Sequence, residues 1–478
     1  MTHCAAARDS SRALMIPSAA AAPTVPSPLD RARTKAYRRL LPLLFVCYVI
    51  AYVDRSNVGI AKLTMTRDLP GFDNAVIGFG AGVFFWGYFL LEIPGSLLVE
   101  KWSARKWICR IMLTWGVMAA CTAFVKTPMQ FYVVRFCLGL AEAGFFPGVI
   151  VYLTHWFPAR DRTRALSLFF VATPIAQIIS PKISNALLKI GTTETINGVA
   201  VRHGEVLGLV GWQWVYIFWG IPAVVLGVLV LLMLKDRPRD AHWLTTEERE
   251  ALERQLEADK AAGGKKRMTL LQALRHPMVL LLAFAYFCTV TGTYGIEFFL
   301  PSIIQQWYNL KIDAITWLVI LPPCVALGAQ LFVGWNSDRT RERRFHAVVP
   351  IAVAVVALAA TPATRGNLPL TIACFMIAFG GLKAYLPAFW ALPSLFLSGS
   401  AAAGSIGLIN SLGNLGGFFG PAVIGKVQTI TGSFVGGIYY LAASMAVTAA
   451  ILFFLGLGNR EKPSTPAAPS STTMPVKA

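Results

Sequence analysis

The chain has 478 residues, of which 55% are hydrophobic and only 14% are charged, whereas charged residues make up about a quarter of an ordinary soluble domain. Its mean hydropathy is +0.58 and its formal net charge at pH 7 is +19. A soluble fold cannot bury so much apolar surface, so the composition excludes a soluble enzyme, a disordered chain, a coiled coil and a disulfide-rich secreted domain. It predicts a protein that lies in a lipid bilayer.

The first 39 residues lack the apolar core of a signal peptide, and their Ala, Pro and Ser content predicts a disordered tail. Apolar segments then follow that are each long enough to cross roughly 30 Å of hydrocarbon as a helix. Twelve such segments can be marked, at 40–61, 76–99, 107–125, 131–152, 165–189, 212–234, 277–302, 315–335, 346–363, 368–390, 404–425 and 435–457.

One long polar stretch, residues 235–276, separates the first six segments from the last six. Its part 246–254 carries opposite charges at i,i+4 spacing, which is typical of a short helix, and 263–267 has the composition of a linker. We therefore predict an all-α integral membrane fold with 12 transmembrane helices, arranged in six-helix bundles at 40–234 and 277–458. A second disordered tail is expected at 459–478.

The basic residues are distributed unevenly between the two sides of the predicted membrane. The tails and the loops on one side hold 30 of the 43 Lys and Arg residues. The positive-inside rule therefore predicts that both termini are cytoplasmic. The same distribution explains the high net charge, so nucleic acid is not expected as a partner.

The two halves repeat a pattern of an acid followed by basic residues. Glu100, Lys101 and Arg105 follow the second span, and Asp338, Arg339 and Arg343 follow the eighth. Such an internal repeat is typical of transporters built from two bundles.

Three further motifs are 52–57 (Tyr-Val-Asp-Arg-Ser-Asn), 135–148 (Arg-Phe-Cys-Leu-Gly-Leu-Ala-Glu-Ala-Gly-Phe-Phe-Pro-Gly) and 408–418 (Leu-Ile-Asn-Ser-Leu-Gly-Asn-Leu-Gly-Gly-Phe). With the span layout, they make residues 35–460 resemble the major facilitator superfamily. More narrowly, they resemble the anion:cation symporter family, in its bacterial branch with tartrate, phthalate and 4-hydroxyphenylacetate permeases. The resemblance implies a transporter of the bacterial inner membrane, not an enzyme, for which a monomer suffices.

Charged residues inside the predicted spans are costly and are interpreted as functional candidates. Arg55 would bind a substrate carboxylate in bidentate fashion, with Asp54 beside it as a proton acceptor. The family resemblance implies the same roles. An internal or interhelical ion pair is the alternative for these two residues.

Glu142 and Arg135 lie two turns apart on one face of the fourth span. Glu142 lies near mid-span among small residues, so we predict that it carries a proton. A helix–helix hydrogen bond is its alternative. Arg135 lies nearer the end of the span, which favours a structural or gating role.

Lys383 precedes an aromatic-rich face that includes Trp390, and with Arg55 it would form a cationic cavity for an anion. Its alternative is a side chain that extends to the membrane interface, and the same alternative applies to Lys182. Glu297, in the seventh span, departs from the family pattern. It would either pair with a lysine or face the outer mouth of the cavity.

Polar residues on the first, second and eleventh spans complete the predicted substrate contacts. Tyr52 and Tyr88 are expected to contact the substrate, with lipid-interface anchoring as the alternative for Tyr88. Asn410 and Asn414, one turn apart, would bind it from the second half, with helix packing as their alternative. Glu92 is expected to be structural.

The loop residues Glu100, Lys101, Arg105, Asp338, Arg339 and Arg343 resemble gate elements that form state-dependent salt bridges, and topology anchoring is their alternative. No metal-ligand cluster or nucleotide motif is expected, so the predicted protein uses no cofactor. The sequence predicts a secondary transporter that imports an organic anion with protons. The substrate would be a dicarboxylate, a hydroxy acid or an aromatic acid, and the alternatives are an anion exchanger, a proton-driven exporter or a membrane solute sensor.

Overall fold

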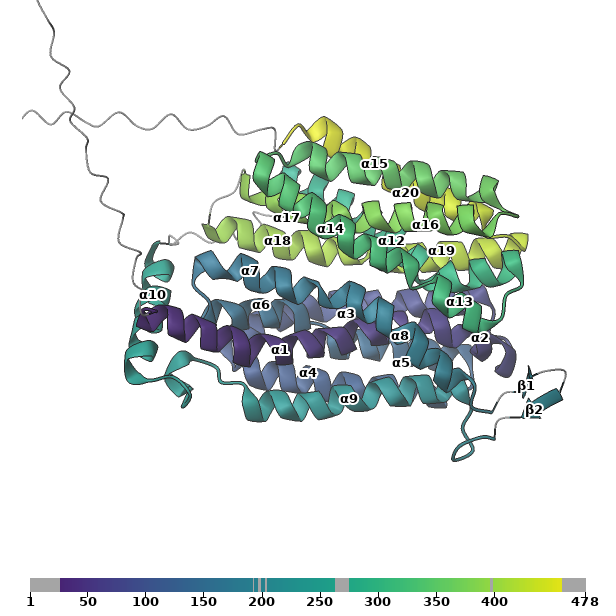
Figure 1. The fold of residues 1–478 in the computed structure, drawn as a ribbon, viewed down its shortest axis with the longest axis horizontal. Helices are drawn as coiled ribbons and strands as arrows, with labels where there is room; N and C mark the ends of the chain where they lie inside the picture. The colour runs from purple at the N-terminus through teal and green to yellow at the C-terminus, as the bar shows by residue number, and fades with distance from the viewer. Residues whose placement is uncertain are drawn as a thin grey trace, which may run out of the picture.

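A computed structural model describes residues 26–191, 193–196, 199–202, 204–262, 275–395 and 399–457. Within these ranges the chain is helical apart from one short hairpin, and most helices run along the long axis of the molecule (Figure 1). The first and second halves form two bundles that lie side by side, drawn purple to teal and green to yellow. The predicted all-α fold is therefore confirmed.

The first bundle contains nine α-helices and one short 3₁₀ helix of the described residues. They are α1 (Pro28–Ser56), α2 (Val58–Asp68), α3 (Asn74–Lys101), α4 (Ala104–Cys121), η1 (Thr122–Phe124), α5 (Pro128–Glu142), α6 (Phe145–Trp156), α7 (Ala159–Phe170), α8 (Ala172–Leu188) and α9 (Gly211–Met233). Between α8 and α9 the strands β1 (Thr193–Ile196) and β2 (Val199–Arg202) pair antiparallel, with Thr193 opposite Arg202.

The second bundle follows the connecting segment, which contains η2 (Pro238–Asp240) and α10 (Thr246–Ala262). Its elements are α12 (Pro277–Tyr308), α13 (Ile312–Leu318), α14 (Leu321–Thr340), α15 (Arg344–Ala360), η3 (Thr361–Thr364), α16 (Leu368–Ala384), α17 (Leu386–Ala391), η4 (Leu392–Leu395), α18 (Gly399–Asn414), α19 (Gly416–Thr431) and α20 (Val435–Leu455).

Ten helical stretches among the described residues are long and apolar enough to cross a membrane. The pairs α7–α8 and α18–α19 run beside them and complete twelve crossings, six in each bundle (Figure 1). The protein is thus a multi-pass membrane protein. We call the two ends of the bundles the α10 end and the hairpin end, after the elements that lie there.

Three of the described crossings break next to charged residues that the sequence singles out, and the tenth does so at Tyr385, between α16 and α17, two residues after Lys383. The first crossing breaks at Asn57, between α1 and α2, two residues after Arg55. The fourth breaks between α5 and α6, where Gly144 has φ +85°, a left-handed conformation that favours glycine. Glu142 therefore ends α5 inside the bundle. Such breaks are tolerated within a membrane where the backbone lines a cavity or is buried in protein.

The bundles contact each other at the hairpin end. There α3 packs along α19, α2 along α12, and α8 against α13 and α14. Glycines permit this approach, since a Cβ on Gly78 would lie 2.3 Å from the Pro421 carbonyl oxygen. Polar contacts reinforce it, because Asp313 on α13 accepts a 2.6 Å hydrogen bond from Asn185 and lies 3.1 Å from the Lys189 ammonium, both of the other bundle.

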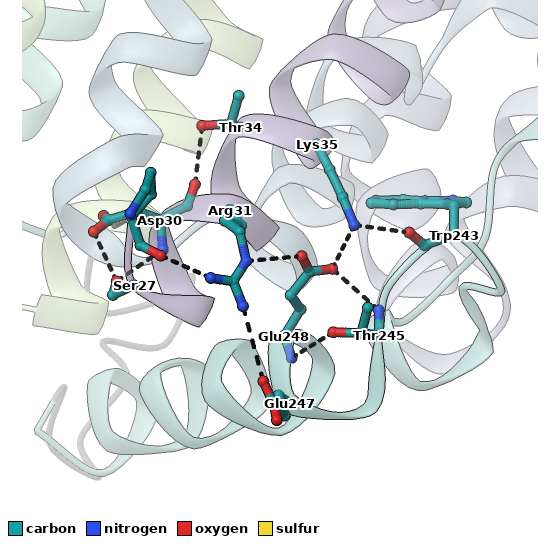
Figure 2. A network of polar contacts seen from close by, with 10 residues as sticks. Ser27, Asp30, Arg31, Thr34, Lys35, Trp243, Thr245, Glu247 and Glu248 are labelled. Atoms are coloured by element: carbon teal, nitrogen blue, oxygen red, sulfur yellow. Dashed lines mark hydrogen bonds and ion pairs between the residues drawn. The ribbon is translucent and has the colours of Figure 1, made fainter. Parts of the chain in front are cut away.

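At the α10 end, the connecting helix is held against α1 by charges (Figure 2). Glu248 accepts hydrogen bonds from Lys35 at 2.7 Å and from the Arg31 guanidinium at 3.4 Å, and Arg31 also pairs with Glu247 at 3.8 Å. The Thr245 backbone N–H donates to Glu248 at 3.0 Å. Burial would raise the pKa of Glu248, but the hydrogen bonds from Lys35 and Thr245 outweigh it and lower the pKa below its ordinary value.

The helix boundaries differ most from the sequence analysis at the start of the first crossing. Residues 28–39, assigned there to a disordered tail, form the first turns of α1, so that part of the prediction is wrong. Ser27 caps the helix by accepting a hydrogen bond from the Asp30 backbone N–H, and Pro28 suits the first helical position. The predicted linker 263–267 and the C-terminal tail 459–478 lie outside the described residues.

Candidate functional site

Arg55 and Glu142 form a buried ion pair at the breaks of the first and fourth crossings. The Arg55 Nε donates to Glu142 Oε1 at 2.6 Å, and the two side chains are only 11% and 1% exposed. The guanidinium carbon lies 4.8 Å from the ring centre of Tyr88, and Nη1 lies 3.5 Å from the Tyr294 hydroxyl of the other bundle. Arg55 therefore lies at the junction of the two bundles, where an anion would have to compete with Glu142 for it.

Asp54, the neighbour of Arg55 in sequence, lies in the first bundle and is close enough to Glu142 to interact with its charge. It is buried, and neither carboxylate oxygen has a hydrogen-bond partner among the described residues. The Trp115 indole and the Arg135 guanidinium are close enough to interact with its charge. Arg135 is itself buried and donates to the Gly80 carbonyl at 3.4 Å. The ion-pair partner of Arg55 is thus Glu142, and Asp54 lies near both Glu142 and Arg135.

A second buried ion pair joins Glu297 of α12 to Lys383 of α16. The Lys383 Nζ lies 3.0 Å from Glu297 Oε1, with side chains 9% and 2% exposed. The Tyr52 hydroxyl, from the first bundle, donates to both Glu297 carboxylate oxygens at 2.9 Å, and Lys383 donates to Tyr52 at 3.4 Å. Glu297 therefore pairs with a lysine, one of the two alternatives that the sequence left open for it, and it balances the charge that Lys383 was expected to add to a cationic cavity with Arg55.

The remaining predicted substrate contacts lie in different environments. Tyr88 is buried beneath Arg55. Asn410 donates its amide to Glu92 of α3 at 2.6 Å, which makes another contact between the bundles. Asn414 is buried one turn further along. The Trp390 ring packs against Tyr286, with centres 5.0 Å apart, inside the second bundle.

The predicted gate residues of the loops lie towards the α10 end, away from these ion pairs, whereas Arg135 lies buried near Glu142. Arg343 donates to Asp338 at 2.6 Å, and Arg339 lies 5.3 Å from the Trp335 ring centre. The Arg105 guanidinium lies 3.8 Å from Asp236, and its backbone N–H donates to the same carboxylate at 3.0 Å. The backbone of Glu100 and Lys101 ends α3, and their side chains lie outside the described part of the chain.

Lys182, left open by the sequence, contributes to the junction at the hairpin end. Its Nζ lies 3.3 Å from the ring centre of Trp317 in the second bundle. Sequence reasoning missed Tyr294 entirely. The available signal was its position three residues before Glu297 on one helix, which places both on the same face. Among the described residues, no group of three or more His, Cys, Asp or Glu is arranged to hold a metal ion.

Comparisons with known proteins agree with this architecture. Residues 44–421 match the sequence profile of the Major Facilitator Superfamily. The chain is 41% identical over 425 residues to the "Putative tartrate transporter" of Agrobacterium vitis, which covers 89% of this chain and 94% of that protein. It is 37% identical over 417 residues to the "Quinolone resistance transporter" of Acinetobacter baumannii, and the alignment covers 87% of this chain and 92% of that protein.

Among solved structures, the fold is similar to the partially occluded inward-open conformation of the xylose transporter XylE from E. coli. The TM-score is 0.67 at 11% sequence identity, over 88% of this chain and 98% of that one. At this identity the likeness concerns the fold alone.

Proposed function

The chain belongs to the major facilitator superfamily, and we propose that it is a secondary transporter that imports an organic anion together with protons. It is a transporter and not an enzyme. The single observation that carries the proposal is the Arg55–Glu142 pair, because it places the cation that suits a carboxylate in direct contact with an acid that can take up a proton.

The pair links anion binding to proton binding through charge. Removing one partner of a buried ion pair leaves an uncompensated charge and costs about 3–5 kcal/mol. A substrate carboxylate can therefore replace Glu142 at Arg55 with little cost only if Glu142 becomes neutral by taking up a proton. Asp54 is a second proton site, since an ionised carboxylate buried without hydrogen bonds is strongly disfavoured.

The membrane potential supplies the reason for coupling. An inside-negative potential opposes uptake of an anion by about 2.3 kcal/mol per charge for each 100 mV. One proton cancels the charge of a monoanion, and a second makes its uptake electrically favourable. With Glu142 paired to Arg55 and Asp54 close enough to Glu142 to interact with its charge, the two acids can carry the number of protons that such uptake requires.

Transport then proceeds by rocking of the two bundles around the site. We place the α10 end and both termini in the cytoplasm, as the positive-inside rule favours, and the protein in a bacterial inner membrane. In this orientation, the contacts of Asp313 and the close approach of α3 and α19 hold the outer side shut. A single chain in lipid suffices for this arrangement of two bundles.

The experiment is uptake into proteoliposomes with an imposed inward proton gradient and a panel of labelled carboxylates that includes tartrate. Wild type is compared with Arg55→Ala and with Arg67→Ala, which removes an exposed arginine of α2. We expect gradient-driven accumulation in wild type and Arg67→Ala and its loss in Arg55→Ala. Equal accumulation in all three proteins would contradict the assignment of Arg55. Efflux driven by the gradient would indicate a proton-driven exporter, the alternative favoured by the similarity to the quinolone resistance transporter.

A further inference from the structure

We propose that the Glu297–Lys383 pair is a subsite for substrate hydroxyl groups, so that the transported anions are short hydroxy acids with the carboxylate at Arg55. The inference rests on the proposed function, which it deepens by assigning the substrate class. It starts from the buried Glu297–Lys383 ion pair, which has no net charge and is distinct from the Arg55 site that would bind the carboxylate.

The charges of the two ion pairs cancel. Arg55 is balanced by Glu142 and Lys383 by Glu297. A second substrate carboxylate would have to separate Lys383 from Glu297, which also holds the Tyr52 hydroxyl. Separating a buried pair leaves a charge without compensation, which is strongly unfavourable. A hydroxyl group avoids that cost, because it donates to a carboxylate and accepts from an ammonium while both remain paired.

A cavity beside Glu297 contains one buried polar atom without a hydrogen-bond partner among the described residues. Glu297 lines a cavity between the bundles together with Ser56, Gln177 and Ser180. Gln177 is 8% exposed, and its Oε1 accepts no hydrogen bond from any described residue. A buried amide oxygen without a donor favours a ligand that brings one. A substrate hydroxyl can donate to Gln177 Oε1, whereas a second carboxylate brings no donor.

The spacing of the two pairs sets the size of the substrate. Tyr52 and Arg55 lie one turn apart on α1, and they contact Glu297 and Tyr294, which lie one turn apart on α12. Side chains at this helical spacing have Cβ atoms about 5–6 Å apart. The hydroxyl subsite is therefore about one helical turn from the carboxylate subsite, a separation that suits hydroxyls two to four carbons from the carboxylate.

The test compares substrates that differ only in hydroxyl groups, by competition with labelled uptake into proteoliposomes. Gluconate is paired with hexanoate, and tartrate with succinate. Sites built to bind a hydroxyl reject analogues that lack it by factors up to about 10⁴–10⁵. We expect wild type to favour the hydroxylated member of each pair by at least ~100-fold. In the neutral double variant Glu297→Gln/Lys383→Met, we expect the ratio to fall below ~10-fold while carboxylate uptake persists.

Additional variants separate this role from a structural one. Glu297→Gln alone leaves Lys383 unpaired and should increase the affinity for succinate relative to hexanoate. The exchanged pair Glu297→Lys/Lys383→Glu should fold and regain part of the hydroxyl preference, and Lys426→Met, which removes an exposed lysine of α19, should leave it unchanged. An unchanged hydroxyl ratio in the neutral double variant, or no preference in wild type, would overturn the inference while the anion transport stands. Absence of any carboxylate uptake by wild type would overturn the proposed function as well.

Discussion

The hydroxyl of Tyr52 on α1 lies 2.9 Å from both carboxylate oxygens of Glu297 on α12 and donates to them across the junction of the two bundles. Each bundle therefore contributes to the other's buried ion pair, since Tyr294 of α12 reaches Arg55 of α1 in the same way. Motion of one bundle against the other must break or remake these contacts. This connects the occupancy of the site to the conformation of the transporter.

Tyr52→Phe removes the hydroxyl and keeps the ring. A hydrogen bond to a charged group contributes about 1.5–3 kcal/mol, so we expect KM for the transported carboxylate to rise about 10- to 100-fold. The measurement is concentration-dependent uptake, with Tyr439→Phe as the control because that tyrosine is exposed on α20. Equal KM values for the two variants would show that the Tyr52 hydroxyl makes no contribution to binding.

Asp313→Asn weakens the contacts that close the hairpin end. Asp313 pairs with Lys189 and accepts from Asn185, but the side chains of the ion pair are 47% and 39% exposed, so solvent reduces its contribution to at most about 1 kcal/mol. We expect a roughly 2- to 5-fold increase in the population open at this end. A cysteine in place of the buried Ser180, in a cysteine-free background, should then react faster with a membrane-impermeant maleimide. Asp240→Asn is the control, and an unchanged reaction rate would argue against the gate.

Gly78→Ala tests whether α3 and α19 must approach closely during transport. The added Cβ would lie 2.3 Å from the Pro421 carbonyl oxygen, closer than any real Cβ contact. We expect closure of the hairpin end to be blocked and the uptake rate to fall by more than about tenfold, because the clash would cost over ~1.4 kcal/mol. Gly328→Ala is the matched control, since a Cβ there meets nothing within 4 Å. If both variants transported normally, this contact would not be part of the cycle.

Glu248→Gln tests the attachment of α10 to α1. The folded-state pKa of Glu248 is lowered, so its stabilising effect is complete above the unfolded value of about 4.3 and is lost as pH falls through the folded value. Lys35 and Arg31 are 40% and 36% exposed, which limits the loss on substitution to about 1–2 kcal/mol. We expect a lower unfolding midpoint for the variant at pH 7 and a difference from wild type that shrinks as pH falls below about 4. Thermal melting across this pH range measures both, and a constant difference at all pH values would contradict the assignment.

Much of the fold could be predicted because the length of an apolar segment determines whether it can cross a bilayer as a helix. The same scarcity of charge identified Arg55, Asp54, Glu142 and Lys383 as candidates. The helical structure of residues 28–39 was not predicted because this part of α1 is polar and depends on contacts with α10 and Asp161.

The pairings could not be predicted, because they depend on tertiary structure. Arg55 has Asp54 as its neighbour in sequence, but its partner is Glu142, 87 residues away. Lys383 likewise pairs with Glu297, 86 residues away. Spacing within one helix shows which residues share a face, whereas contacts between helices depend on how the bundles pack. The junction also depends on helix breaks such as that at Gly144, whose left-handed conformation is not encoded in hydropathy.

The most direct test of the account is the transport behaviour of Glu142→Gln in proteoliposomes. Glutamine cannot carry the proton but retains the shape of the side chain, so we expect counterflow of the substrate without a pH gradient to persist and accumulation driven by an inward proton gradient to be lost. Glu342→Gln, which changes an acid of the loop at the α10 end, should retain both activities. Undiminished proton-driven accumulation by Glu142→Gln would contradict the assignment of Glu142 as the acid that links proton uptake to anion binding at Arg55.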